Sequence, residues 1–267
     1  MKISFTTLGC PRWNWREITA TACDLGYQGV EVRGVGKDIS VPSVPAFSDE
    51  HLPATMRELQ RLRLEIPCLD SDCCIHLPQT EAAVTREVEA YIRLAQKLSV
   101  PYVRVMATAP VPQPVGDVDD GYVRERACAL GAYAASHGVV LLIETHGVWS
   151  DSERLARLLS TVASDSEGAL WDVHHPYRFM GEKPETTFQN LRPWLKHTHF
   201  KDSAKLDGSY RYCLPGFGDL PLDEIINTLR LGGYDGFYSL EWVKRWDMTL
   251  EEPGIVFAHY ANYMRTA

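Results

Sequence analysis

Three carboxylates and one imidazole stand at the ends of short apolar runs in the second half of the chain. The four side chains belong to Glu144, Asp172, His199 and Glu241. Such an oxygen-rich set with a single nitrogen suits a hard divalent cation. Mn²⁺ or Mg²⁺ fits it best, and the imidazole also allows Co²⁺ or Zn²⁺. We therefore predict one bound divalent metal ion, with Mn²⁺ as the first choice.

The alternative for each ligand is an ordinary structural role. A single glutamate at a strand end is more often part of a loop ion pair or a helix cap than a metal ligand. Four such residues on four successive strands are harder to explain in that way. The metal-site interpretation depends on this repetition and not on any one residue.

Several further side chains are candidates for substrate contact. On the seventh strand His197, His199 and Lys201 share one face, because strand side chains alternate. His199 lies nearer the carboxyl end and is the better ligand, whereas His197 lies one layer below it. Lys201 either reaches the mouth of the site or is a surface lysine, and the sequence leaves both interpretations open.

Two more histidines follow the ligand positions, and His175 is placed to swing back and bind a substrate hydroxyl. His146, two residues beyond Glu144, is a substrate contact, a support for a ligand, or neither. In the loop after the first strand, Trp15 is a candidate wall beside the C–H face of a sugar. For Arg104, in the fourth strand, a buried salt bridge is the simpler expectation.

Eight alternations of a short apolar run with a longer amphipathic stretch must position these groups. The runs lie at Ile3–Thr7, Gly29–Arg33, Ile66–Leu69, Tyr102–Ala107, Val139–Ile143, Ala169–Trp171, His197–Phe200 and Phe237–Leu240. Continuous apolar runs are typical of parallel strands covered on both faces. Eight of them in 267 residues predict an α/β fold, a single (β/α)₈ TIM barrel over residues 1–267. In such barrels chemistry sits at the carboxyl ends of the strands.

Helix-like periodicity fills the intervals between the runs. The clearest segments are Thr80–Leu98, Asp151–Val162, Leu222–Leu231 and a segment that begins at Ser48 as N-cap and runs to Leu62. Gly26, Gly138 and Gly232-Gly233 come just after expected helix ends, where a left-handed residue is needed. We expect Ala109–Val118 and Ser203–Pro215 to be loops. An open doubly wound sheet is the alternative fold, but Thr6–Pro11 is not a glycine-rich phosphate turn.

Composition narrows the class of partner. The formal net charge of −8 disfavours nucleic acid and anionic membranes, and no apolar run is long enough to span a bilayer. Seven cysteines without framework spacing, and no recognisable signal peptide, indicate reduced thiols in a cytoplasmic protein. The expected partner is a small-molecule carbohydrate substrate.

At the ligand positions the sequence resembles the sugar phosphate isomerase/epimerase superfamily, the xylose isomerase-like barrels. That group includes ketose 3-epimerases, inosose dehydratases and hydroxypyruvate isomerases. The matching motifs are Ile143-Glu144-Thr145-His146, Trp171-Asp172-Val173-His174-His175-Pro176, His199-Phe200-Lys201-Asp202 and Ser239-Leu240-Glu241-Trp242. The resemblance implies that Glu144, Asp172, His199 and Glu241 bind the metal and that His175 touches substrate. It also implies a substrate-binding arginine, for which Arg211 is a loose match, and allows a homodimer or homotetramer.

The chemistry that we infer is proton abstraction beside a carbonyl, with the metal stabilising the resulting enediolate. Glu144 and Glu241 come from non-adjacent strands, so one can remove a proton while the other returns one. This predicts a metal-dependent sugar isomerase or epimerase. A dehydratase of a cyclic polyol or keto acid on the same scaffold is the first alternative. An apurinic-type endonuclease and a non-catalytic sugar-binding barrel are weaker ones.

Overall fold

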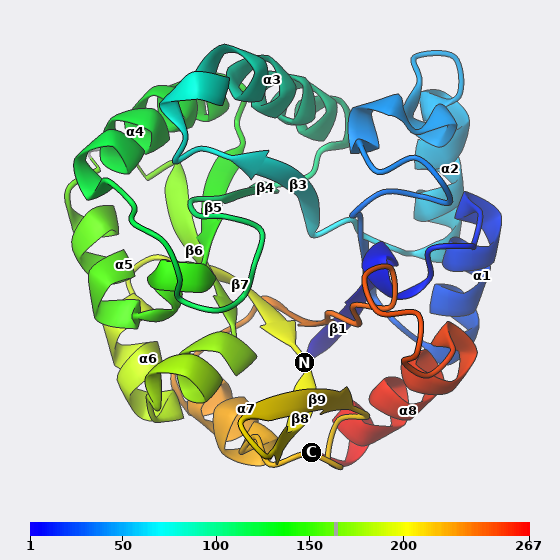
Figure 1. Ribbon diagram of the computed structural model, residues 1–267. Coiled ribbons are helices and arrows are strands. Elements are labelled where there is room, and N and C mark those ends of the chain that lie inside the picture. The colour runs from blue at the N-terminus through cyan, green and yellow to red at the C-terminus, as the bar shows by residue number, and fades with distance from the viewer. Residues whose placement is uncertain (163–164) are drawn as a thin grey trace. The chain divides into compact units, whose positions relative to one another are not determined.

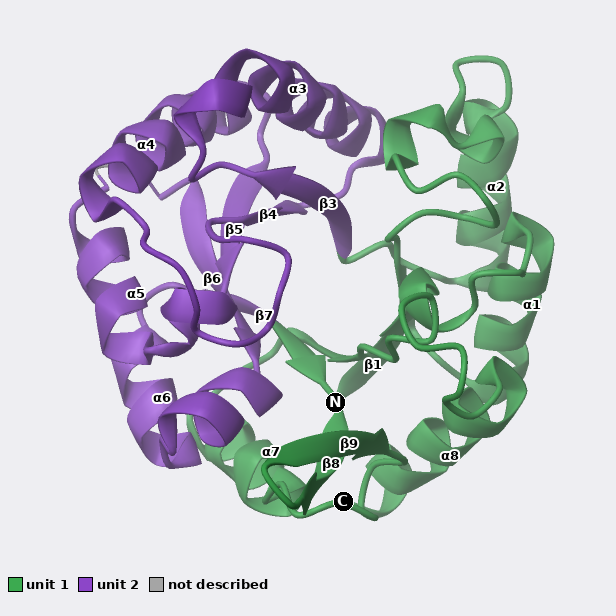
Figure 2. Cartoon of the chain, in the orientation of Figure 1, with its two compact units in different colours: residues 1–67, 198–267 green, residues 68–197 purple. Residues whose placement is uncertain are grey.

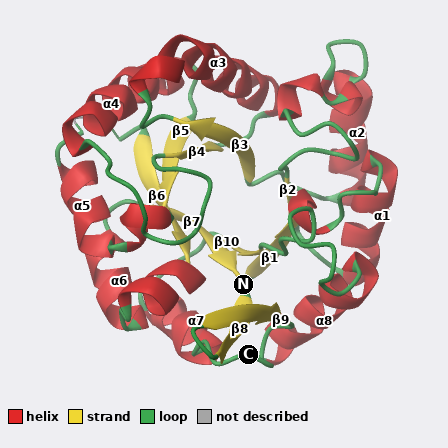
Figure 3. Ribbon diagram, viewed as in Figure 1, coloured by secondary structure: helices red, strands yellow, loops and turns green. Residues whose placement is uncertain are grey.

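The apolar runs of the sequence form parallel strands in the computed structural model, which describes residues 1–162 and 165–267. Over these residues the strands are β1 (Lys2–Thr6), β2 (Gly29–Glu31), β3 (Cys68–Cys74), β4 (Tyr102–Met106), β5 (Val140–Glu144), β6 (Glu167–Asp172), β7 (Leu195–Phe200) and β10 (Phe237–Leu240). They make one eight-stranded sheet in the order β2-β1-β10-β7-β6-β5-β4-β3 (Figure 3). The eight predicted strands are therefore confirmed. β3 differs most, because it continues through two aspartates beyond the apolar run.

Amphipathic helices follow the strands, as their periodicity predicts (Figure 1). They are α1 (Trp15–Leu25), α2 (Leu52–Leu62), α3 (Glu81–Leu98), α4 (Asp120–Ser136), α5 (Ser152–Ser160), α6 (Pro184–Leu191), α7 (Leu222–Leu231) and α8 (Pro253–Thr266). Short 3₁₀ turns are η1 (Thr7–Gly9), η2 (Val41–Ser43), η3 (Pro45–Phe47), η4 (Pro78–Thr80) and η5 (Gly147–Ser150), and η6 (Pro176–Met180) is a π-helical turn. No helix within the described ranges is long and apolar enough to cross a membrane.

The chain divides into two compact units (Figure 2). Unit 1 comprises Met1–Pro67 and Thr198–Ala267, and unit 2 comprises Cys68–His197. The prediction of a single domain over residues 1–267 stays a prediction. β7 runs through the boundary, so the seventh strand begins in unit 2 and ends in unit 1.

Unit 2 contains β3 to β6, paired in parallel in chain order, with the first half of β7. Helices α3, α4 and α5 pack against these strands (Figure 1). Cys68, Leu142 and Leu170 form a fully buried cluster from three of the strands. β5 and β6 end at Glu144 and Asp172, two of the predicted metal ligands.

In unit 1, β1 lies between β2 and β10, and β10 pairs with the second half of β7. α1 and α8 cover β1 and β2. Phe5 is fully buried, stacks on Phe257 at a centroid distance of 4.0 Å and meets the edge of Tyr27. Gly26 ends α1 in the left-handed conformation with φ 76°, as its position predicts.

Two local predictions are wrong. Ser48 is not the N-cap of α2: that position is His51, and Ser48 instead follows η3 and accepts the backbone hydrogen bonds of His51 and Leu52. Residues 203–215 are not all loop, because β8 (Asp202–Leu206) and β9 (Ser209–Cys213) form an antiparallel hairpin. The polar composition of this hairpin concealed its strands, whereas 109–118 is irregular as predicted.

The aromatic stack in unit 1 gives a stability prediction. We expect Phe5→Ala to lower the free energy of unfolding by about 3–5 kcal/mol, because it removes a buried ring and leaves a cavity. Phe217 is 72% exposed, so Phe217→Ala is the matched control and should change stability by less than about 0.5 kcal/mol. Urea unfolding followed by circular dichroism measures both. Equal effects of the two substitutions would contradict this account of the core.

Candidate functional site

The two predicted ligands of unit 2 lie at the carboxyl ends of neighbouring strands. Glu144 is the last residue of β5 and Asp172 the last of β6, and both are buried. Glu144 is in register with Leu170, so Asp172 lies on β6 just beyond the residue that pairs with Glu144. A carboxylate oxygen of Glu144 lies within 4.8 Å of one from Asp172. Two acidic groups this close and this buried need a positive partner.

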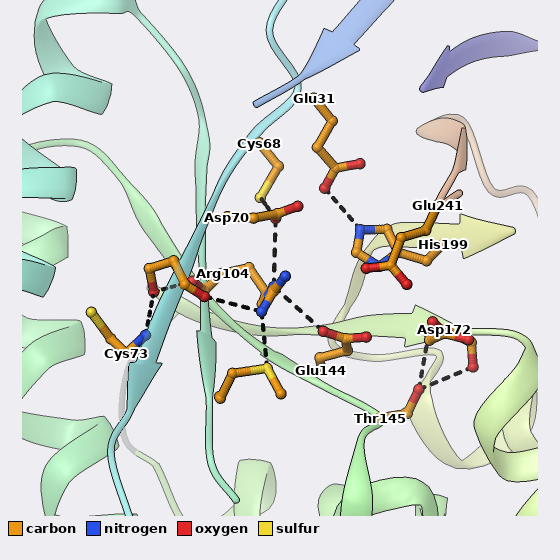
Figure 4. Close-up of polar contacts among 12 residues, drawn as sticks. Glu31, Cys68, Asp70, Cys73, Arg104, Glu144, Thr145, Asp172, His199 and Glu241 are labelled. Atoms are coloured by element: carbon orange, nitrogen blue, oxygen red, sulfur yellow. Dashed lines mark hydrogen bonds and ion pairs between the residues drawn. The ribbon is translucent and has the colours of Figure 1, made fainter. Parts of the chain in front are cut away.

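Arg104 supplies positive charge on the other side of Glu144. Its Nε lies 3.4 Å from Glu144 Oε2 and 3.5 Å from Asp70 Oδ1, so one buried guanidinium bridges two carboxylates (Figure 4). Its Nη1 donates to the carbonyl oxygen of Ser71 at 3.0 Å. The expected buried salt bridge of Arg104 is therefore present. The guanidinium of Arg104 thereby orients the carboxylate of Glu144.

Asp172 is held by the turn that follows β5. The Thr145 hydroxyl accepts from the backbone N–H of Asp172 at 2.9 Å, and the N–H of His174 donates to Asp172 Oδ1 at 2.9 Å. His175 Nδ1 lies 2.9 Å from the carbonyl oxygen of Thr145. Since a carbonyl oxygen only accepts, Nδ1 carries a proton and Nε2 is the nitrogen on the side of Asp172. That nitrogen lies 3.8 Å from Asp172 Oδ2, so His175 lies beside a predicted ligand, and its contact with substrate stays a prediction.

The remaining substrate-contact candidates are placed differently from one another. The His146 ring meets the edge of the His175 ring at a centroid distance of 5.0 Å. Trp15 is the first residue of α1 and not a loop residue, and it is buried edge-on against Phe47. Arg211 lies exposed on β9, opposite Ala204. His146 is thus in direct contact with another candidate, and the substrate roles of all three residues stay predictions.

The two predicted ligands of unit 1 are also side by side. His199 is on β7, Glu241 directly follows β10, and the Glu241 backbone N–H donates to Phe200 O at 2.9 Å. His199 Nδ1 lies 3.5 Å from Glu241 Oε1. The ammonium group of Lys201 donates to the other oxygen of Glu241 and is almost fully buried. Of the two interpretations of Lys201, the surface lysine is thus wrong.

A buried carboxylate that the sequence analysis missed lies behind His199. Glu31, the last residue of β2, is fully buried, and its Oε1 lies 2.9 Å from His199 Nε2 (Figure 4). The Ser239 hydroxyl donates to its other oxygen. Glu31 was hidden because the run Gly29–Arg33 reads as one strand that ends at an arginine. A glutamate inside an otherwise apolar run was the available signal.

Asp202 anchors the chain beyond the hairpin. Its Oδ2 accepts from the backbone N–H groups of Gly216 and Gly218 at 2.9 Å each, and its Oδ1 accepts from that of Ser203 at 2.8 Å. Burial raises the pKa of the Asp202 carboxyl, and these backbone hydrogen bonds oppose the rise. A Cβ at Gly218 would lie 2.0 Å from Asp202 Oδ1, so this approach requires glycine. Asp202 is structural support for the segment after Lys201.

Comparison with known proteins identifies the family. The family model described as xylose isomerase-like TIM barrel matches residues 20–261. The chain therefore belongs to this family, and both the resemblance and the predicted TIM-barrel fold class are confirmed.

Two curated relatives are enzymes. Fructoselysine 3-epimerase of Shigella flexneri is 24% identical over 263 residues, covering 95% of this chain and 93% of the relative. 3-Dehydroshikimate dehydratase of Bacillus anthracis is 26% identical over 257 residues, covering 86% and 85%. The relatives thus include one epimerase and one dehydratase, which are the two leading classes that the sequence analysis left open.

Solved structures share the fold. The probable 3-dehydroshikimate dehydratase AsbF from Bacillus anthracis has a TM-score of 0.80 at 22% identity and covers 99% of both chains. A Mycobacterium smegmatis barrel in complex with magnesium has a TM-score of 0.77 at 16% identity, covering 99% of this chain and 95% of that one. IOLI protein with a bound zinc atom has a TM-score of 0.78 at 16% identity, covering 99% and 97%.

The bridging guanidinium gives a prediction about unit 2. Arg104→Met leaves Asp70 and Glu144 buried without their shared partner, so we expect a loss of about 3–5 kcal/mol in the free energy of unfolding. Arg93 is half exposed and pairs with Glu89 on the surface of α3, so Arg93→Met should cost about 1 kcal/mol or less. Chemical denaturation compares the two variants. Similar losses of unfolding free energy in the two variants would mean that the buried ion pairs of Arg104 do not stabilise the fold more than a surface ion pair does.

Proposed function

We propose that this chain is a metal-dependent epimerase or isomerase of a sugar or sugar-like keto compound. One observation carries the proposal: Glu144, Asp172, His199 and Glu241 lie at or just beyond the carboxyl-terminal ends of β5, β6, β7 and β10, which are consecutive in the sheet. In a barrel of this family, active sites form at that end of the strands. As in the sequence analysis, these four side chains are the proposed ligands of one metal ion.

The donor set fits a hard divalent ion. Three of the four donors are carboxylates, all four side chains are buried, and each pair already holds its donors close together. Oxygen-rich sites with one imidazole suit Mn²⁺ and Mg²⁺, and Co²⁺ or Zn²⁺ can also be accepted. The magnesium and zinc in two structures of the same fold are consistent with this range. Mn²⁺ is our first choice.

The reaction that these residues can perform is proton transfer beside a carbonyl. A divalent ion at the site supplies Lewis-acid stabilisation of the negative charge that develops on substrate oxygen. Glu144 and Glu241 each present a carboxylate, so one can take the proton from carbon while the other returns one. His175, whose Nδ1 donates to the carbonyl oxygen of Thr145, would in its neutral form accept a hydrogen bond from a substrate hydroxyl at Nε2. The ammonium group of Lys201 donates to Glu241 and holds this carboxylate in place.

Neutralising either glutamate tests the two-carboxylate mechanism. We expect Glu144→Gln and Glu241→Gln each to reduce kcat by at least about 10²-fold, because each removes a proton acceptor. Glu125→Gln, at a side chain 73% exposed, is the control and should keep the wild-type rate. A ketose screen monitored by chromatography measures turnover, and circular dichroism checks the fold. Wild-type rates in either site variant would remove the mechanism from consideration.

Removing the metal tests the cofactor. Protein stripped with a chelator should lose activity, and Mn²⁺ should restore it, with Mg²⁺, Co²⁺ and Zn²⁺ compared in parallel. Bound ion also stabilises the native state, by about 2.7 kcal/mol when the free ion is at 100 times its Kd. Thermal unfolding with and without Mn²⁺ measures this effect independently of any substrate. Undiminished turnover by the stripped protein would refute metal dependence.

A dehydratase remains the second candidate function, because a curated relative and a similar structure are 3-dehydroshikimate dehydratases. Dehydration also begins with proton removal beside a carbonyl, and then expels a β-hydroxyl instead of returning the proton. The product decides between the two. Epimerisation conserves mass, whereas dehydration removes one water and creates an absorbing enone. Mass spectrometry of reactions with ketoses and with cyclic keto acids therefore assigns the class.

A further inference from the structure

The carboxylate of Glu31 on β2 contacts the predicted imidazole ligand on β7, and β1 and β10 lie between these two strands in the sheet. β2 and β10 both pair with β1, where Thr6 is in register with Glu31 and Ser4 with Ser239. Ser239 is in turn in register with His199 of β7. The Glu31 side chain spans this distance, with one oxygen on His199 Nε2 at 2.9 Å and the other receiving the Ser239 hydroxyl. Both ends of the contact are fully buried.

This contact fixes which nitrogen of His199 carries the proton. An ionised carboxylate only accepts hydrogen bonds, so Nε2 must be the donor. In the neutral ring the lone pair is then on Nδ1, which faces Glu241 Oε1 at 3.5 Å. A lone pair that faces a carboxylate oxygen is unfavourable by itself, and a cation bound by both atoms makes it favourable. The arrangement therefore suits a metal-binding Nδ1.

We propose that Glu31 is a positioning residue that holds His199 in the Nε2–H form and thereby sets the metal affinity of the site. The proposal rests on the proposed metal site. Carboxylates behind metal-binding histidines fix the tautomer and the ring orientation, and their loss typically weakens binding about 10–100-fold. The Ser239 hydroxyl donates to the Glu31 carboxylate and thereby orients Glu31.

Metal affinity of chelator-stripped protein is the first test. Isothermal titration with Mn²⁺ should give a Kd about 10–100-fold higher for Glu31→Gln than for the wild type. Ser239→Ala should shift Kd in the same direction by less. Glu65→Gln is the control, because Glu65 is exposed and its backbone bridges to β2 beside Glu31. Its Kd should equal that of the wild type.

A merely structural role for Glu31 predicts a different pattern. The melting temperature of Glu31→Gln would then fall while the Kd of its folded fraction stayed within about twofold of the wild type, which overturns the proposal. Absence of Mn²⁺ binding by the wild type refutes the proposed metal site itself and this inference with it. The two failures are thus distinguishable.

The tautomer gives a readout that needs neither metal nor substrate. In ¹⁵N-resolved NMR of metal-free wild-type protein, the His199 ring should show a protonated Nε2. The signal is assigned by its absence from His199→Asn. A ring without a proton on Nε2 overturns the proposal even if Glu31→Gln does not fold.

Discussion

Buried carboxylates at the ends of parallel strands are the constraint on which the site depends. A carboxylate taken out of water is costly unless hydrogen bonds and opposite charge compensate it. Unit 2 meets this requirement for Glu144 with Arg104, which Asp70 shares from the other side. Unit 1 meets it for Glu241 with Lys201. The proposed metal ion would provide the rest of the positive charge.

The fold could be predicted because parallel strands buried on both faces read as uninterrupted apolar runs. Leu222–Leu231 was predicted to the residue, since its apolar spacing and the glycines after it agree. β3 was placed too early, because Asp70 and Asp72 extend it beyond the apolar run. The hairpin of Asp202–Cys213 was missed for a related reason. Most of its side chains are exposed or half-buried, so no apolar signal separates it from a loop.

The candidate site residues are polar side chains that end apolar runs, and this pattern identifies only part of the site. It selects residues at strand ends, such as Glu144 and Asp172, and passes over those within a run. Glu31 was not identified as a site residue, because β2 ends two residues before the polar Arg33 that closes the predicted run. Its contact with His199 depends on the register of four strands. Pairing between strands far apart in the sequence is not encoded in any single segment.

What separates epimerisation from dehydration is the fate of the intermediate after the first proton transfer. Returning the proton requires a second acid on the opposite face of the reacting carbon, and expelling hydroxide requires an acid beside the leaving oxygen. Glu144 and Glu241 follow β5 and β10, which are three places apart in the sheet order, and the proposed mechanism assigns them the two proton transfers. Lys201 is the nearest donor to Glu241 and is already engaged by it. A proton delivered by Lys201 to a leaving hydroxyl would leave the Glu241 carboxylate beside a neutral amine, and the proposed dehydratase alternative carries this cost.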